Sequence, residues 1–305
     1  MTEAIIKSQP TAKELRAKAG DVFDLLDASD TTKADYKLRI GLFLDFIKKQ
    51  GANNNSFREF KRSLAERTDI AVSTKNKYLT SAKVFLRELN RQGIIPTDIT
   101  QNTKGFNQDK KYKKEGLNDE EIGKLSVELG KLARTPQNAR LRAIIALLAL
   151  QGLRQIEVVR LDCKDIDLVN KTAFIRGKGR DDKEPIDLHP ETIELLKDYI
   201  KTNKKKDGAL FTSDSNRSTK DHRLTTRSLR RIVKETLTEL NIDKTTHGFR
   251  HYFTTTLIKS YKGDLLMVAQ YTRHRGLERL QVYNDSVKKK ADLPRYYGAF
   301  SGVKF

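Results

Sequence analysis

The sequence predicts a mainly helical protein with a small β-hairpin, divided into two domains. Apolar residues recur at helical spacing along much of the chain, as between Thr31 and Lys49. Two short apolar stretches, 172–176 and 185–188, instead flank a cluster of glycine and aspartate, which is typical of a β-hairpin. A length of 305 residues is sufficient for about two domains.

The first hundred residues are predicted to form a helical bundle, which we take as the first domain, 1–100. The segment 1–30 is polar and gives only weak evidence for a short helix, whereas helices are expected at about 31–49, 57–67 and 74–92. A run of glycine, alanine and asparagine from Gly51 separates the first two of these helices, and Gly93 ends the bundle.

A lysine-rich segment follows the bundle. Residues 101–115 contain almost no apolar side chains, so they are predicted to form a linker between the two domains. We expect this linker to lie along DNA through its basic residues. The candidates are Lys110, Lys111, Lys113 and Lys114.

The second domain is predicted to span 116–290 and to be followed by a tail, 291–305. Asn118 is expected to cap a helix whose first turn is acidic. The run 139–150 is the most apolar in the chain and indicates a buried helix, which Gly152 ends. Further helices are expected at 153–161, from Pro190 to about Tyr199, and at about 226–240, where Arg227, Arg230 and Arg231 are candidate DNA contacts.

Composition points to nucleic acid as the partner. The formal net charge is +20 and the pI is about 9.8. Both domains are basic, because residues 1–115 hold 23 Lys and Arg against 15 Asp and Glu, and the remaining residues hold 37 against 25. Positive charge on two domains suits a duplex that is held from both sides, although part of it only solvates helix surfaces.

The same composition excludes other classes of protein. A single cysteine, Cys163, rules out an internal disulfide and a cysteine-cluster metal site, and we interpret it as a small packed residue. No signal peptide is recognisable, and no apolar run approaches the roughly 18 residues that a membrane helix requires. We therefore expect a cytoplasmic protein that makes no membrane contact.

Between His247 and Tyr283 the chain carries side chains that can break a phosphodiester. His247-Gly-Phe-Arg250-His is followed by Arg-His274 and, nine positions later, by Tyr283, in what the pattern predicts to be one helical stretch. His247 and Arg250 are three residues apart and share a helix face, and arginine binds phosphate through paired donors. A tyrosine hydroxyl, with a free pKa of about 10, becomes a useful nucleophile where cations stabilise charge on the phosphoryl oxygens.

Together with Gly152-Leu-Arg154-x-x-Glu157 and Gly177-Lys178-Gly, these residues resemble the tyrosine recombinase (phage integrase) family in its two-domain, Xer-like form. The five elements follow the family order from about 116 to 290. One position departs from the family, which usually has glycine before the second histidine, where this chain has Arg273. The resemblance implies a helical, SAM-like core-DNA-binding domain followed by a tyrosine-recombinase catalytic domain.

The resemblance also implies a mechanism and a role for each residue. Tyr283 is the expected nucleophile, forming a 3′-phosphotyrosine link and releasing a 5′-hydroxyl. The other roles are Arg154 and Arg250 on the non-bridging phosphate oxygens, Lys178 as the general acid, His247 assisting proton loss from the tyrosine, His274 bonding the phosphate, and Glu157 supporting the pocket. No cofactor, ATP or metal is implied.

The partners implied are double-stranded DNA and other copies of the chain or a related recombinase, as a dimer on one site and a tetramer in synapsis. Apolar side chains of the tail are candidates for docking on a neighbouring protomer: Leu293, Tyr296, Tyr297 and Phe300. Two other functions stay open, a type IB-like DNA topoisomerase and a non-catalytic DNA-binding protein on the same fold. One sequence reveals neither the DNA target nor whether the chain is a mobile-element integrase or a chromosome or plasmid dimer resolvase.

Each of these residues also has an ordinary structural interpretation. Arg154 can be a surface cap after an apolar helix, and Lys178 a solvated turn residue. Tyr283 can be an aromatic side chain packed under a C-terminal helix. His251, directly after Arg250, is predicted to point to another side of the helix and to be structural.

Overall fold

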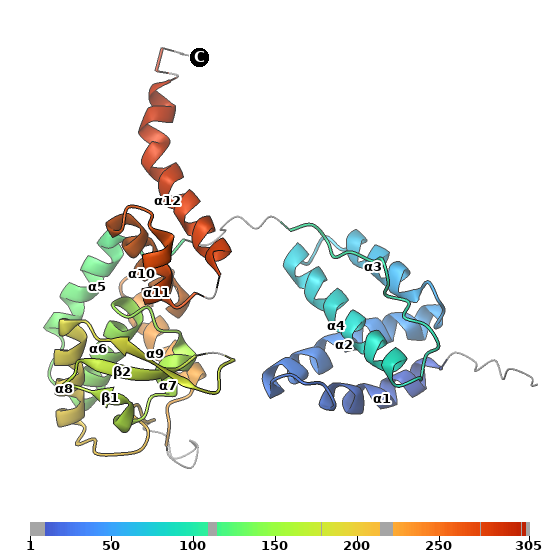
Figure 1. The fold of residues 1–305 in the computed structure, drawn as a ribbon, viewed down its shortest axis with the longest axis horizontal. Helices are drawn as coiled ribbons and strands as arrows, with labels where there is room; N and C mark the ends of the chain where they lie inside the picture. The colour runs from blue at the N-terminus through green and yellow to red at the C-terminus, as the bar shows by residue number, and fades with distance from the viewer. Residues whose placement is uncertain are drawn as a thin grey trace, which may run out of the picture. The chain divides into compact units, whose positions relative to one another are not determined.

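The computed structural model describes residues 10–108, 115–177, 179–213, 222–274, 276–299 and 301–302. The chain divides into two compact units, Met1–Asp109 and Lys110–Phe305 (Figure 1). Within the described residues, no helix has the length and apolar character needed to cross a membrane. Five of the predicted site residues lie outside the described residues: Lys110, Lys111, Lys113, Lys114 and Lys178.

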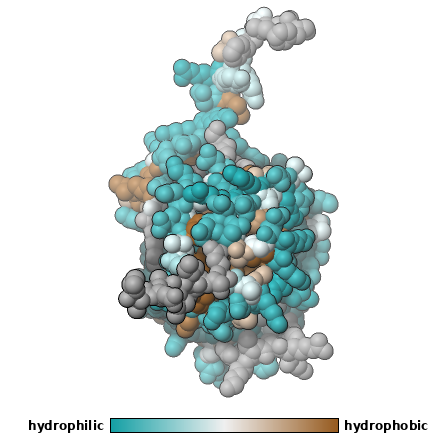
Figure 2. Space-filling model, turned by 90° about the vertical axis from the view of Figure 1, so that its right-hand side faces the viewer, coloured by the Kyte–Doolittle hydropathy of each residue, from teal (hydrophilic) through white to brown (hydrophobic). Residues whose placement is uncertain are grey.

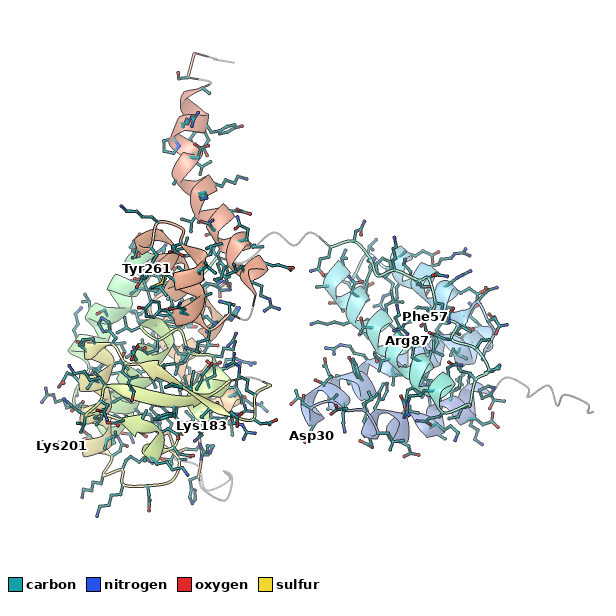
Figure 3. All side chains as sticks on the ribbon, in the orientation of Figure 1. Asp30, Phe57, Arg87, Lys183, Lys201 and Tyr261 are labelled. Carbon is teal, nitrogen blue, oxygen red and sulfur yellow. The ribbon has the colours of Figure 1, made fainter. Side chains whose placement is uncertain are left out.

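The N-terminal unit is a helical bundle with an aromatic core. Its helices are α1 (Ala12–Asp24), α2 (Asp30–Gln50), α3 (Ser56–Glu66) and α4 (Val72–Arg91), so the weakly indicated first helix is present and the other three agree with prediction. The buried phenylalanines, including Phe57 labelled in Figure 3, are Phe23, Phe43, Phe57, Phe60 and Phe85. Burying a side chain of this size stabilises the fold by about 1.5–3 kcal/mol.

Local signals set the ends of these helices. Thr11 caps α1 in a reciprocal capping box with Glu14, and Ser29 accepts a hydrogen bond from the amide of Thr32 at the start of α2. Gly51 ends α2 with a φ of +82°, a conformation that glycine adopts without a steric penalty.

The segment after α4 folds back onto that helix. The side chain of Asn76 donates to the carbonyl oxygen of Phe106 at 3.0 Å and accepts from the Phe106 amide at 2.8 Å. The first part of the segment predicted to be a linker, 101–115, is therefore bound to the N-terminal unit.

The C-terminal unit is built around one buried helix. Helix α6 (Pro136–Ala149) packs against α7 (Gln155–Val159), α8 (Pro190–Thr202), α9 (Thr226–Glu239) and α10 (Thr246–Ser260), which confirms the buried helix predicted at 139–150. Every residue from 143 to 149 is buried. Helix α5 (Asp119–Lys131) begins at the predicted cap, Asn118, which forms a capping box with Glu121.

A small antiparallel sheet lies beside these helices in the order β1-β2-β3. The predicted hairpin is present as β2 (Thr172–Arg176) and β3 (Lys183–Asp187), with Phe174 opposite Pro185. A short strand, β1 (Ile166–Asp167), adds to β2 and was not predicted, because two residues are too few for a periodic pattern.

The stretch that carries the histidines and Tyr283 is broken into three helices, so the prediction of one helical stretch is wrong. Helix α10 is followed by α11 (Leu265–Thr272) and α12 (Leu277–Gly298). Lys262 and Gly263 have φ of +51° and +85° and turn the chain after α10, and Arg273 has a φ of +55° at the end of α11. Helix α12 continues past residue 290, and its C-terminal half projects from the unit in Figure 1.

Candidate active site

Arg154 and Glu157 are held by the turn that links α6 to α7. Gly152 adopts a φ of +58°, and a Cβ atom there would lie 2.2 Å from the ring of Phe253, so only glycine fits. Arg154 then stands at the N-cap of α7, and its guanidinium and its amide each donate to a different carboxylate oxygen of Glu157 at 2.8 Å. Glu157, expected to support the pocket, thus contacts Arg154 directly.

Arg250 lies buried on α10 and binds two carbonyl groups. Its Nη1 donates to the carbonyl oxygen of Gly152 at 2.6 Å, and its Nη2 donates to that of Thr272. Burial, followed by repulsion from Arg154, lowers the pKa of Arg250 to about 9, so the group remains a cation at neutral pH. A guanidinium has five N–H donors, which leaves donors for a phosphate.

His274 follows α11 and has a defined tautomer. The hydroxyl of Thr272 donates to the carbonyl oxygen of Val268 at 2.7 Å, and the same oxygen lies 2.7 Å from Nδ1 of His274. Because the hydroxyl proton is already engaged, Nδ1 must be the donor, which leaves Nε2 as an acceptor in the neutral ring. Burial, then the charge of Arg250, lowers the pKa of His274 to about 4.

The carboxylate of Glu157 has a second arginine that the sequence reasoning did not assign to the site. Nη2 of Arg273 lies 2.9 Å from Oε2 of Glu157. Burial by itself would raise the pKa of Glu157, but Arg273 and then Arg154 hold it below its ordinary value. Glu157 is therefore a carboxylate that two guanidinium groups hold in place.

Tyr283 of α12 packs against His251 of α10, which in turn contacts His247. The rings of Tyr283 and His251 are 5.0 Å apart between centroids, and those of His251 and His247 are 4.4 Å apart in an edge-to-face contact. The prediction that His251 points to another side of the helix is wrong, because His247 and His251 are four residues apart and share a helix face. The packing of α12 on that face could not be predicted from the sequence, since it depends on the turns on either side of α11.

The protonation states of these rings follow from burial and from the neighbouring cations. Burial raises the pKa of the Tyr283 phenol, and nearby arginines, Arg250 foremost, offset part of that rise. Burial and then His247 lower the pKa of His251 to about 3. Desolvation and then Arg250 lower the pKa of His247, although its ring reaches solvent. At neutral pH the phenol thus keeps its proton, beside imidazoles that are neutral and able to accept one.

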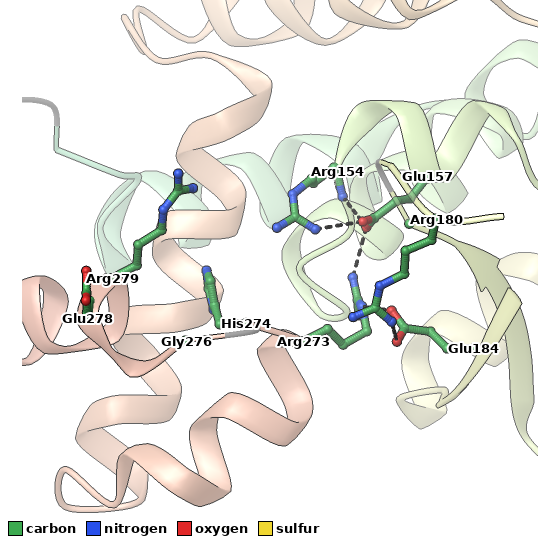
Figure 4. Close-up of a pocket in the computed structure, with 10 residues that line it drawn as sticks. Arg154, Glu157, Arg180, Glu184, Arg273, His274, Gly276, Glu278 and Arg279 are labelled. Atoms are coloured by element: carbon green, nitrogen blue, oxygen red, sulfur yellow. Dashed lines mark hydrogen bonds and ion pairs between the residues drawn. The ribbon is translucent and has the colours of Figure 1, made fainter. Parts of the chain in front are cut away.

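Four arginines, Arg154, Arg180, Arg273 and Arg279, line a cavity of about 550 Å³, shown in Figure 4, whereas Arg250 is not among its lining residues. Its lining residues are Arg154, Glu157, Gly177, Arg180, Glu184, Arg273, His274, Gly276, Glu278 and Arg279. Tyr283 and His251 line a separate hollow of about 510 Å³. The charges of Arg250, Arg279 and Arg154 nevertheless reach the Tyr283 phenol, since they act to lower its pKa. Cations around an open space are suited to bind a phosphodiester and stabilise charge on its oxygens. Arg180 and Arg279 were not singled out from the sequence, because isolated arginines in a basic chain give no pattern.

A second basic surface lies on α9. Arg227, Arg230 and Arg231 are exposed there, and the first and last of them border a hollow of about 720 Å³. Arg231 also lies 3.8 Å from Glu235, a distance that leaves it available for other contacts. On the N-terminal unit, the face turned to the viewer in Figure 2 is largely hydrophilic, as expected for a protein with this charge.

Comparison with known proteins identifies the family. The model described as "Phage integrase family" matches residues 117–290, which is more than half of the chain. The chain therefore belongs to the phage integrase family. Its activity is accordingly that of a site-specific tyrosine recombinase on DNA, which agrees with the resemblance found in the sequence.

Individual relatives agree with this assignment. Tyrosine recombinase XerC of Lactobacillus delbrueckii subsp. bulgaricus is 28% identical over 72% of this chain and 74% of its own length. The fold is shared with XerH site-specific recombinase bound to palindromic difH substrate, at 20% identity and a TM-score of 0.76 over 97% of this chain and 99% of that one. It is also shared with a lambda integrase tetramer bound to a Holliday junction, at 12% identity and a TM-score of 0.68 over 92% and 79%.

Proposed function

We propose that Tyr283 is the nucleophile and that its oxygen attacks the scissile phosphorus. A bond forms between the phenol oxygen and phosphorus, and the bond from phosphorus to the 5′-oxygen breaks, which leaves a 3′-phosphotyrosine and a free 5′-hydroxyl. The observation that carries this proposal is the packing of Tyr283 against His251. His251 directly follows Arg250 in the same chain. A single chain thus supplies both the phenol and the cations.

Two arginines are proposed to bind the non-bridging oxygens. Arg154 is directed by Glu157 toward the cavity, and Arg250 is fixed by two carbonyl groups, so neither needs to reorganise when phosphate enters. His274 would complete this shell through Nε2 once that nitrogen carries a proton, which an incoming phosphate charge favours by raising the pKa of the ring. Removing one such donor lowers the rate by about 10²–10³.

Proton transfers at the two ends of the reaction are assigned to different residues. Neutral His247 would accept the phenol proton, and Lys178 would donate a proton to the departing 5′-oxygen as the general acid. The ester energy is kept in the phosphotyrosine bond, so a 5′-hydroxyl from a second duplex can reverse the step. In this scheme the reaction needs neither ATP nor a metal ion.

The nucleophile assignment is tested with Tyr283→Phe. The variant should give no covalent protein–DNA product on a nicked target site, since phenylalanine has no attacking oxygen. DNA binding, measured in parallel, should be unchanged. Tyr296→Phe is the matched control, because Tyr296 lies exposed near the end of the same helix. Covalent product from Tyr283→Phe would overturn the assignment.

Binding to double-stranded DNA is proposed to take place in the cytoplasm and to use both halves of the chain, since residues 1–115 and the remaining residues each carry an excess of Lys and Arg. The exposed arginines of α9 would contact phosphates, as would the predicted linker lysines, namely Lys110, Lys111, Lys113 and Lys114. Because each phosphate contact releases counterions, the logarithm of affinity should fall steeply with the logarithm of salt concentration. A flat salt response would contradict this part of the proposal.

We further propose a dimer on one DNA site and a tetramer in synapsis, made of this chain alone or with a related recombinase. Tyr296 and Tyr297 are 57% and 62% exposed on the projecting part of α12, and aromatic side chains are common in protein interfaces. Phe300, also predicted to dock, lies outside the described residues. The predicted tail boundary, 291, falls within α12.

The tail is tested by a chain that ends after Ala291. This end keeps Val287 in its apolar cluster and keeps the ion pair between Lys290 and Glu115, 2.6 Å long, so the Tyr283 region stays intact. Cleavage of one site should persist while recombination between two sites is lost. A full-length Tyr296→Ser, Tyr297→Ser variant should behave in the same way. Unchanged recombination in both would contradict tail docking.

A further inference from the structure

Arg273 occupies a backbone conformation that arginine rarely adopts. Its φ of +55° and ψ of +41° lie in the left-handed region at the C-terminal end of α11. A residue with a Cβ atom is less stable there by about 1–2 kcal/mol, which is the physical reason for the glycine usual at this position in the family. Contacts made by the arginine side chain can offset this cost.

Those contacts are with two carboxylates on different elements. The side chain of Arg273 is only 7% exposed, and its Nη2 lies 2.9 Å from Oε2 of Glu157 on α7. Its Nε lies 3.4 Å from Oε1 of Glu184 on β3. Glu184 also forms an ion pair with Arg180, which lies between β2 and β3 in the sequence. Figure 4 shows the guanidinium between these two acids.

The guanidinium therefore connects three walls of the cavity. One wall is α7, where Glu157 directs Arg154. The second is the β2–β3 hairpin, and β3 is an edge strand that pairs only with β2 in the described sheet. The third is the connection from α11 to α12, where the next residue is His274.

We propose that Arg273 is a positioning residue that holds the β2–β3 hairpin against the Arg154–Glu157 pair. This inference rests on the proposed function, in which Lys178, between β2 and β3 in the sequence, protonates the leaving oxygen. Proton transfer depends on distance, so a hairpin free to shift by about 1 Å would slow cleavage by about 10²-fold. Arg273 acts on the leaving group through the hairpin and does not itself touch the DNA.

The test uses two DNA substrates that differ in their need for an acid. In the first, an ordinary phosphodiester, the 5′-oxygen must gain a proton as it leaves. In the second, sulfur replaces that bridging oxygen, and a thiol of pKa about 8.5 leaves as the thiolate without a proton. Covalent-complex formation at saturating DNA is measured for full-length Arg273→Gly, Lys178→Ala and Arg154→Ala, with DNA affinity measured separately.

Arg273→Gly should cleave the phosphodiester about 10-fold to 100-fold more slowly, with unchanged DNA affinity, and should recover to near the parental rate on the sulfur substrate. Lys178→Ala should show the same recovery, and Arg154→Ala should be slow on both substrates. Adding Glu184→Gln to Arg273→Gly should slow cleavage no further, because the two residues act as a unit.

Lys171→Gly is the matched control. Lys171 is an exposed basic residue with a φ of +58° in the turn between β1 and β2, so the change removes one positive charge and one left-handed side chain, as Arg273→Gly does. It touches neither carboxylate and should leave both rates unchanged. A merely structural effect of glycine would instead appear in both variants.

The outcomes distinguish a failure of the inference about Arg273 from a failure of the proposed role of Lys178. If Lys178→Ala recovers on sulfur but Arg273→Gly stays slow on both substrates, Arg273 acts on the phosphate side and the inference is overturned while the proposed function stands. Parental cleavage of the phosphodiester by Arg273→Gly would also overturn it. If Lys178→Ala fails to recover, the general-acid assignment is wrong, and the route proposed for Arg273 falls with it.

Discussion

The N-terminal unit places five phenylalanine rings at its centre, whereas the C-terminal unit buries ionised groups in addition to its own apolar core. In the second unit the side chains of Glu157, Arg250 and Arg273 are almost completely buried. The main buried charge of the first unit is Glu88, which pairs with the exposed Arg91 at its surface. All five histidines also belong to the second unit.

This difference shows which unit is built for chemistry. Apolar burial stabilises a fold without directing reactive groups. Buried ions are stabilising only when they are well paired, and they can be replaced by apolar residues with little loss of stability. Several buried ionised side chains around one cavity are useful where a phosphate binds to cations that are already in position. The contrast between the units can be tested by perturbing each kind of core.

The largest effect is expected from Phe60→Ala in the aromatic core. The centroid of this ring lies 5.0 Å from that of Phe43, and truncating it should lower the free energy of unfolding by about 3–5 kcal/mol. Amide hydrogen exchange should accelerate in α1–α4 and stay unchanged in α5–α9. Leu38→Ala, at a residue 79% exposed on α2, should change stability by less than about 0.5 kcal/mol. Equal loss of protection in both units would contradict separate cores.

A somewhat smaller effect is expected from Glu157→Gln in the ionic core. The amide removes the charge between Arg154 and Arg273, and breaking such a buried arrangement typically lowers stability by about 3 kcal/mol. Cleavage should slow as well, because Arg154 loses its orientation. Glu194→Gln, which removes an exposed pair with Lys197, should change stability by less than about 1 kcal/mol. A Glu157→Gln variant with parental stability and a parental cleavage rate would show that this carboxylate does not orient Arg154.

Acid should weaken the C-terminal unit first. The folded pKa of His251, about 3, lies below the unfolded value of about 6.5, so the unfolded chain binds more protons between these pH values and stability falls as pH falls. Between pH 6.5 and 5 this one residue should remove about 2 kcal/mol. Hydrogen exchange at both pH values measures the effect, and His251→Phe should reduce it. Equal acid sensitivity in the histidine-free N-terminal unit would contradict the explanation.

Local patterns predicted most of the elements. The buried helix at 139–150, the cap at Asn118 and the hairpin all depend on neighbouring residues, and all three are present. The contact of Arg154 with Glu157 also spans only three positions, so it too is local in the sequence. Lys178 and the linker lysines remain predictions, as do the catalytic roles.

The parts that sequence reasoning missed depend on tertiary packing. The position of His251 beside Tyr283 follows from the crossing of α10 and α12, which neither helix encodes by itself. The ion pair between Arg273 and Glu157 joins residues 116 positions apart. The departure at Arg273 was visible in the sequence, but its two carboxylate partners were not.

The central claim is that one chain supplies both the phenol and the cations that surround the phosphate. It is tested most directly by mixing an inactive variant, Tyr283→Phe, with a strongly impaired one, Arg154→Ala, on a nicked duplex that carries paired binding sites. We predict no more covalent protein–DNA product from the mixture than from Arg154→Ala alone, since each chain lacks part of its own site. Product that appears only on mixing would show that Tyr283 serves the arginines of a neighbouring chain, and would contradict this account.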